Sequence, residues 1–153
     1  MKKITLILFT VLILCAGHAA AQTTISEADK AGIKETALDY AEGWYEGNAD
    51  KMESSLSPDL AKRIARTNPQ NQTRLDHMTA MALVQGTRSG FGKQTPAAEQ
   101  QKDVLIYDVF GGASTVKLEM RDWIDYMQIA KINGKWLIVN VLWEMKPRKQ
   151  ASN

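Results

Sequence analysis

The chain has 153 residues, 44% of them hydrophobic and 24% charged, which is the composition of a globular protein with room for one core. Its formal net charge of +2 excludes the strongly basic field that attracts nucleic acids or anionic membranes. Its one cysteine, Cys15, excludes an internal disulfide and a cluster of thiolate metal ligands.

The first 21 residues have the pattern of a bacterial-type secretory signal peptide. Lys2 and Lys3 form a basic start, residues 4–14 carry no charge, and residues 19–21 are the small residues that a signal peptidase reads. The uncharged run is shorter than the roughly 20 residues that span a bilayer. We therefore expect export to the periplasm or the medium. The mature chain, residues 22–153, is predicted to be a single domain with 17 basic and 17 acidic residues that binds neither nucleic acid nor a membrane.

A long amphipathic helix is predicted over residues 26–46. Ser26 is a typical N-cap residue, and Gly47 followed by Asn48 is a typical helix end. Acidic residues occupy one face, and the opposite face is expected to pack on a core because apolar residues recur on it at helical spacing. These residues are Ile33, Ala37, Tyr40 and Trp44.

Shorter elements are predicted in the middle of the chain. A second helix over residues 49–56 ends before Pro58, and residues 59–66 fit either a short strand or a turn. A third helix is predicted over residues 73–85, with His77 at the boundary of its buried side. Residues 86–98, which contain three glycines and a proline, are expected to form a loop at the rim of a pocket.

Two β-hairpins are predicted in the C-terminal half. Their turns are Gly111-Gly112 and Asn133-Gly134, and both dipeptides suit the positive φ angles of a two-residue turn. The runs on either side of each turn are rich in β-branched and aromatic residues. The sequence therefore predicts helices followed by an antiparallel meander.

The turns also predict which side chains share a face of the sheet. In the first hairpin, Tyr107 is expected opposite Val116 on an apolar face. In the second, Asp125 is expected opposite Leu142, with Asn140 diagonally next to Asp125 on one face. The other face of this hairpin is almost purely apolar, and three short helices cannot cover two such faces. We therefore expect a homodimer that covers the outer face of the sheet.

Three segments, in order along the chain, resemble one known family. Residues 37–47, 58–63 and 136–144 are similar to stretches of the putative lumazine-binding proteins within the nuclear transport factor 2-like (SnoaL-like) superfamily. The resemblance implies an α+β cone, with N-terminal helices packed in the concave face of a strongly bent antiparallel sheet, often as a homodimer. It implies no particular activity, because the superfamily includes isomerases, dehydratases, cyclases and non-catalytic proteins. Ser57 stands where the family often has a histidine, which weakens a histidine-based site.

In such a cone, four residues form the candidate ligand-binding site: Tyr40, Trp44, Asp125 and Asn140. The carboxylate and the amide would hydrogen-bond the edge of a pterin-like or other small aromatic ring, and the two aromatic residues would stack on it. In the alternative interpretation, Asp125 and Asn140 face outward and are satisfied by water or a partner chain. No metal or other cofactor is expected, because the mature chain has one histidine and no carboxylates at ligand spacing.

Two further functions stay open. One is a cofactor-independent lyase or isomerase in which Asp125 moves a proton together with Tyr40 or His77. The other is a homodimeric interaction domain whose cone is filled by its own side chains. The near-zero charge of the mature chain, Ser57 in place of a histidine and the lack of an obvious acid–base pair favour a non-catalytic binding domain.

Overall fold

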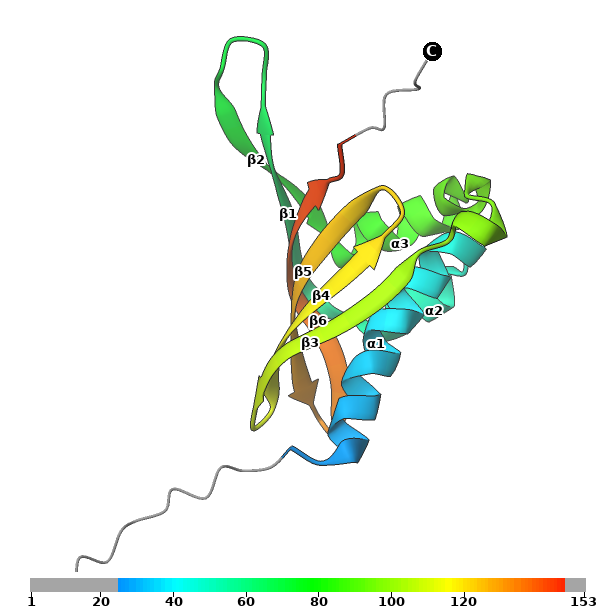
Figure 1. Ribbon diagram of the computed structural model, residues 1–153, viewed down its shortest axis with the longest axis vertical. Coiled ribbons are helices and arrows are strands. Elements are labelled where there is room, and N and C mark those ends of the chain that lie inside the picture. The colour runs from blue at the N-terminus through cyan, green and yellow to red at the C-terminus, as the bar shows by residue number, and fades with distance from the viewer. Residues whose placement is uncertain (1–24, 148–153) are drawn as a thin grey trace, which may run out of the picture.

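The structure is a computed structural model that describes residues 25–147 (Figure 1). Three helices pack against one face of a curved six-stranded sheet, so the α+β class is confirmed. The helices are α1 (Glu27–Glu46), α2 (Ala49–Ser55) and α3 (Ala80–Arg88). The strands are β1 (Leu56–Thr67), β2 (Thr73–Thr79), β3 (Lys102–Phe110), β4 (Ala113–Met120), β5 (Trp123–Ile132) and β6 (Lys135–Met145), and two short 3-10 helices, η1 (Phe91–Gln94) and η2 (Ala97–Glu99), connect α3 to β3.

The predicted signal peptide, residues 1–21, lies outside the described residues. Within residues 25–147, no helix combines the length and the apolar character that crossing a membrane requires.

The structure confirms the predicted bounds of the first two helices to within one residue. The Ser26 side chain accepts a hydrogen bond from the backbone N–H of Asp29 at 3.0 Å. Gly47 ends α1 with a φ of 65°, a left-handed conformation that a residue without a Cβ adopts at little cost. Asn48 then caps α2 by accepting from the backbone N–H of Lys51 at 3.1 Å.

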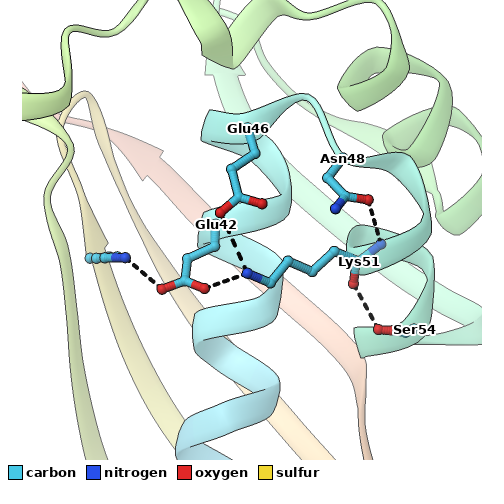
Figure 2. Close-up of polar contacts among 6 residues, drawn as sticks. Glu42, Glu46, Asn48, Lys51 and Ser54 are labelled. Atoms are coloured by element: carbon cyan, nitrogen blue, oxygen red, sulfur yellow. Dashed lines mark hydrogen bonds and ion pairs between the residues drawn. The ribbon is translucent and has the colours of Figure 1, made fainter.

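Ion pairs join α1 to its neighbours (Figure 2). Lys51 Nζ on α2 lies 2.5 Å from Glu42 Oε2 and 3.5 Å from Glu46 Oε1, both on α1. Lys102 Nζ, at the start of β3, lies 2.5 Å from the other oxygen of Glu42. Since these side chains are partly exposed, each pair stabilises the fold by at most about 1 kcal/mol. Their main effect is to fix α2 and β3 relative to α1.

The strands lie in the order β2-β1-β6-β5-β4-β3, so the last strand of the chain is in the middle of the sheet. All neighbours are antiparallel except β1 and β6, which pair in parallel. The prediction of a wholly antiparallel sheet is therefore wrong at this contact. No tight turn joins β1 to β6, so hairpin geometry does not fix their relative direction.

The prediction of a helix over residues 73–85 is wrong in its first half. Residues Thr73–Thr79 form β2, which pairs with β1, and α3 begins at Ala80. The backbone hydrogen bonds between β1 and β2 satisfy the polar backbone groups of β2. These residues therefore form a strand, although their apolar side chains recur at helical spacing. It also settles residues 59–66, which belong to the long strand β1. His77 is exposed on β2, on the opposite face from Met78.

The predicted register of the β3–β4 hairpin holds only next to its turn. Asp108 pairs with Thr115 as the Gly111-Gly112 turn requires, but beyond a bulge Ile106, and not Tyr107, pairs with Val116. An extra residue on one strand exchanges the two faces beyond it. Tyr107 is therefore 54% exposed, and the expectation that it shares an apolar face with Val116 is wrong.

The β5–β6 hairpin departs from its predicted register in the same way. Ile129 pairs with Ile138 as the Asn133-Gly134 turn requires, but a bulge follows, and Asp125 pairs with Trp143 instead of Leu142. The expectation that Asp125 and Asn140 share one face is therefore wrong. Beyond the bulge, Val141 and Trp143 face the helices, whereas Asn140 pairs with the exposed Gln128.

Buried apolar side chains pack together where the first half of α1 meets the β5–β6 turn. Ile33, Ile129 and Ile138 are fully buried there, and the Trp136 ring lies on Gly32. A Cβ at Gly32 would lie 2.9 Å from Trp136 Cδ1, so the close contact requires glycine. We call this region, defined by these five residues, the closed end.

At the outer side of the closed end, the Asp29 side chain forms hydrogen bonds that connect α1 to the β5–β6 hairpin. Its Oδ1 accepts hydrogen bonds from Lys131 Nζ at 2.6 Å and from Trp136 Nε1 at 3.1 Å. The hydrogen bond from Lys131, helped by that from the Ser26 hydroxyl, lowers the pKa of Asp29 to about 2. The carboxylate therefore stays ionised and links α1 to the β5–β6 hairpin.

Candidate functional site

A pocket of about 970 Å³ lies at the other end of the helix–sheet interface. Its walls come from the second half of α1, from α3, and from the strands on both sides of β6. We call this region the open end. Its aromatic and large apolar lining residues are Tyr40, Trp44, Met78, Leu83, Trp123 and Trp143.

Three tryptophans from three elements form one side of the pocket. The Trp44 and Trp123 rings meet edge to face at 5.6 Å, and the Trp123 and Trp143 rings do so at 6.2 Å. Gly92 of η1 holds Trp44 in place, because a Cβ there would lie 2.2 Å from the Trp44 carbonyl oxygen. The three rings therefore form one continuous aromatic wall, and η1 packs directly against its Trp44 end.

A buried ion pair lies at the base of the pocket. Lys62 is 4% exposed and Asp125 is fully buried, and the Lys62 ammonium donates a hydrogen bond to Asp125 Oδ1. It also donates to the Tyr40 hydroxyl at 2.7 Å, and Trp123 Nε1 donates to Asp125 Oδ2 at 2.8 Å. We call these four residues the floor cluster. Both oxygens of the carboxylate are thus engaged from within the protein.

Strand alternation explains how two charges come to meet in the core. Lys62 lies two residues from the buried Leu60 and Ile64 on β1, so all three side chains point to the same, inward face. Asp125 shares the inward face of β5 with the buried Met127 in the same way. Both strands flank β6, so their inward side chains reach each other across it. Burying either charge alone would cost several kcal/mol, and each residue here supplies the partner that the other requires.

Burial also sets the protonation of the floor cluster. It lowers the pKa of the Lys62 ammonium, an effect that the neighbouring Asp125 carboxylate opposes. Burial, together with the Asp125 charge, raises the pKa of Tyr40 well above its usual value. The Tyr40 hydroxyl therefore keeps its proton at neutral pH. The Lys62 Nζ lies 4.8 Å from the centre of the Trp143 ring, whose face further stabilises the cation.

The charged residues at the rim are paired with each other. Arg121 Nη2 lies 2.9 Å from Glu99 Oε2, and Lys146 Nζ lies 2.9 Å from Glu119 Oε1. Lys146 also donates to Gln101 Oε1 at 2.8 Å. The rim therefore presents ion pairs rather than a field of one sign.

The structure brings together three of the four predicted site residues. Tyr40 and Trp44 line the pocket, and Asp125 lies directly beneath it. Asn140 is not among them, because the bulge in β6 turns it to the outer face. There it accepts a hydrogen bond from Arg63 Nη1 at 2.8 Å and donates one to Gln128.

In the described part of the chain, neither a histidine-based catalytic site at the pocket nor a group of metal-binding side chains is present. His77 is exposed on the face of β2 that points away from the pocket, and the adjacent Asp76 pairs instead with Arg66 and Arg74. Within residues 25–147, no three histidine or acidic side chains are grouped so that they could hold a metal ion.

Sequence reasoning missed Lys62, the central residue of the floor cluster. A usable signal was present, since Lys62 lies between Leu60 and Ile64 in a run that alternates like a half-buried strand. Trp143 was placed on the wrong face, because the bulge in β6 has no equivalent signal in the sequence.

Comparisons with known proteins agree with this geometry. Residues 28–144 match the family described as "Putative lumazine-binding". The chain belongs to this family. No curated protein matches its sequence.

Several solved structures share the fold. A nuclear transport factor 2-like protein of unknown function from Shewanella baltica has a TM-score of 0.63 at 18% identity, over 82% of this chain and 99% of that chain. One from Methylobacillus flagellatus has a TM-score of 0.59 at 19% identity, over 81% of this chain and 97% of that chain. At these identities the similarity shows the fold alone. It confirms that this member of the lumazine-binding family has the nuclear transport factor 2-like cone.

Proposed function

We propose that the protein is an exported, non-catalytic domain that binds a small, flat, largely apolar molecule at its open end. The observation that carries this proposal is the pocket of about 970 Å³ with its wall of Trp44, Trp123 and Trp143. Small-molecule sites are typically concave, mostly apolar and largely formed in advance. The family description, which names a flat heteroaromatic ring, supports the same class of ligand.

The experiment is native mass spectrometry of the protein purified from its own host. We expect a retained small molecule that absorbs in the ultraviolet and is released on denaturation. The double variant Trp44→Ala/Trp143→Ala should lose it, whereas Leu142→Ala, on the outer face, should keep it. If wild-type protein carries no such molecule, or if both variants keep it, the proposal fails.

The second candidate is a cofactor-independent lyase or isomerase. Its support is the buried hydrogen-bonded chain of Tyr40, Lys62 and Asp125. Within it, burial raises the pKa of Tyr40 and lowers the pKa of Lys62, and perturbed pKa values of this kind are typical of catalytic groups. However, Asp125 has both oxygens occupied and is fully buried, so it cannot reach a substrate proton without breaking the ion pair. The geometry therefore favours binding. Turnover of the retained molecule by the purified protein would reverse this preference.

We also propose that the protein is a homodimer through the outer face of the sheet. Large apolar side chains on this face are between 42% and 54% exposed, and they lie on three strands: Leu105, Tyr107, Tyr126 and Leu142. Such a patch is unusual on a monomer. Light scattering at micromolar concentration should give twice the mass of the mature chain, and Leu142→Asp should give a monomer. A monomeric wild type would contradict the dimer and leave the pocket proposal unaffected.

Export rests on the pattern of residues 1–21 alone. Cell fractionation should place the protein outside the cytoplasm, with its first residue at or near Gln22. Full-length protein in the cytoplasm would contradict export.

A further inference from the structure

In the floor cluster, one N–H of the Lys62 ammonium has no hydrogen-bond partner among the described residues. A lysine ammonium has three N–H groups. Two hydrogen bonds of the Lys62 ammonium are present, to Asp125 Oδ1 and to the Tyr40 hydroxyl, which leaves one N–H without a hydrogen-bond partner in the described part of the chain. Because Lys62 also lines the pocket, this third N–H is the polar group that a bound molecule meets at the base.

The predicted carboxylate and amide are both already engaged by other protein groups. Asp125 accepts from Lys62 and from Trp123 Nε1, is fully buried and does not line the pocket. Asn140, the other predicted acceptor, is on the outer face and bonded to Arg63 and Gln128. At the base of the pocket, Lys62 therefore offers a hydrogen-bond donor, whereas the sequence predicted a carboxylate and an amide there.

The charge of the site is already balanced. Asp125 neutralises Lys62, and at the rim Glu99 neutralises Arg121, while Glu119 lies against Lys146. A carboxylate or phosphate pushed into this pocket would lose its hydration and meet no uncompensated positive charge. A neutral oxygen carries a far smaller desolvation cost and accepts the same hydrogen bond.

We infer that the ligand of the open end is an uncharged flat ring whose carbonyl-type oxygen accepts a hydrogen bond from Lys62. This inference rests on the proposed function and narrows it to one class of molecule. Trp44, Trp123 and Trp143 hold the ring, and Lys62 selects for the acceptor. Asp125 acts as a positioning residue that keeps the ammonium in place and cancels its charge.

Three bicyclic probes of similar size test the inference by equilibrium dialysis. They are naphthalene, which has no acceptor, chromone, which has a neutral carbonyl, and 1-naphthoate, which is an anion. We expect wild-type protein to bind chromone at least about tenfold more tightly than either other probe, the effect of one well-made hydrogen bond. Equal binding of naphthalene and chromone would overturn the inference and leave the proposed flat-ligand pocket intact. Binding of none of the three would overturn both.

Two variants separate the roles of donor and charge. Lys62→Met/Asp125→Leu removes the ion pair as a unit, so no buried charge is left alone, and it should bind chromone no better than naphthalene. Asp125→Asn leaves the ammonium without its counter-charge and should reverse the preference, so that 1-naphthoate binds more tightly than chromone. Lys51→Met, in the surface network of Figure 2, is the matched control and should behave as wild type.

Thermal unfolding of each variant checks that it is folded at the temperature of the dialysis. If Asp125→Asn does not fold, the double variant alone decides the question. Retention of the chromone preference by the double variant would contradict the assignment of Lys62. A wild type that prefers 1-naphthoate would contradict the charge argument.

Discussion

The closed end and the open end of this protein share α1, β5 and β6, and the open end adds residues of β1, β2 and α3. The two ends differ in what fills the space between helix and sheet. At the closed end, the side chains of Ile33, Ile129 and Ile138 are fully buried, and the Trp136 ring lies directly on Gly32. At the open end, the same helix and strands enclose a pocket and a buried ion pair. The additional elements and the large aromatic side chains of the open end therefore surround a pocket, whereas small and branched apolar side chains meet directly at the closed end.

The two ends also contribute differently to stability. The closed end gains free energy from apolar burial, which is roughly proportional to the area removed from water. The open end carries a desolvated pair of charges, whose attraction does little more than offset the cost of burying them. The two ends of α1 are thus stabilised by different interactions, apolar packing at the closed end and a compensated ion pair at the open end. The following substitutions test this division.

The largest effect is expected for Asp125→Leu at the open end. It leaves the Lys62 ammonium buried without a partner and should lower the free energy of unfolding by about 3–5 kcal/mol. Adding Lys62→Met should restore it to near the wild-type value, because the pair is then replaced by two apolar side chains. Urea unfolding measures both. If the single variant is as stable as wild type, the ion pair does not exist in solution.

A smaller loss is expected for Ile129→Ala at the closed end. Removing a fully buried isoleucine side chain leaves a cavity and should cost about 3 kcal/mol. Affinity for an open-end probe such as chromone should not change, since the pocket does not include this residue. A parallel loss of probe affinity would show that the two ends are coupled.

Trp123→Phe is expected to cost about 2 kcal/mol, because it removes the hydrogen bond from the indole Nε1 to the Asp125 carboxylate while it keeps an aromatic ring. The matched comparison is Trp44→Phe, whose indole is not bonded to the floor cluster. Equal stability of the two variants in urea would argue that the Trp123 hydrogen bond is not made.

The smallest effect is expected in acid, at the closed end. The pKa of Asp29 is lowered to about 2, mainly by the hydrogen bond from Lys131. The unfolded chain therefore binds more protons than the folded one below the usual aspartate pKa. The stabilising effect of Asp29 is present above about pH 4 and is lost as the pH falls towards 2. Asp29→Asn and Lys131→Met should both make the melting temperature fall less steeply over this window, and unchanged slopes would contradict the assignment.

Local signals explain what the sequence could predict. The cap at Ser26, the stop at Gly47 and the apolar spacing of Tyr40 and Trp44 all act within one helix, so α1 and its contribution to the pocket followed directly. The Asn133-Gly134 turn likewise fixed the pairing of its nearest residues. The family resemblance supplied the cone itself.

Long-range pairing explains what the sequence could not predict. A turn sets the register only as far as the first bulge, and a single extra residue in β6 moved Asn140 out of the site and Trp143 into it. Lys62 was missed because the strand nature of β1 depends on partners distant in the sequence, β2 and β6. The sequence left open whether Asp125 faces inward or outward, and its partner Lys62 was not foreseen.

The central place of β6 has a consequence for the order in which the molecule folds. The β1–β2 hairpin and the β3–β4–β5 meander touch through β6, which follows the other five strands in the described part of the sequence. Neither half of the sheet can join the other until the whole chain is available, and Lys62 and Asp125 remain hydrated until then. Such contacts, distant in sequence, form slowly. The Lys62–Asp125 ion pair, which joins the two halves of the sheet across β6, therefore forms late in folding.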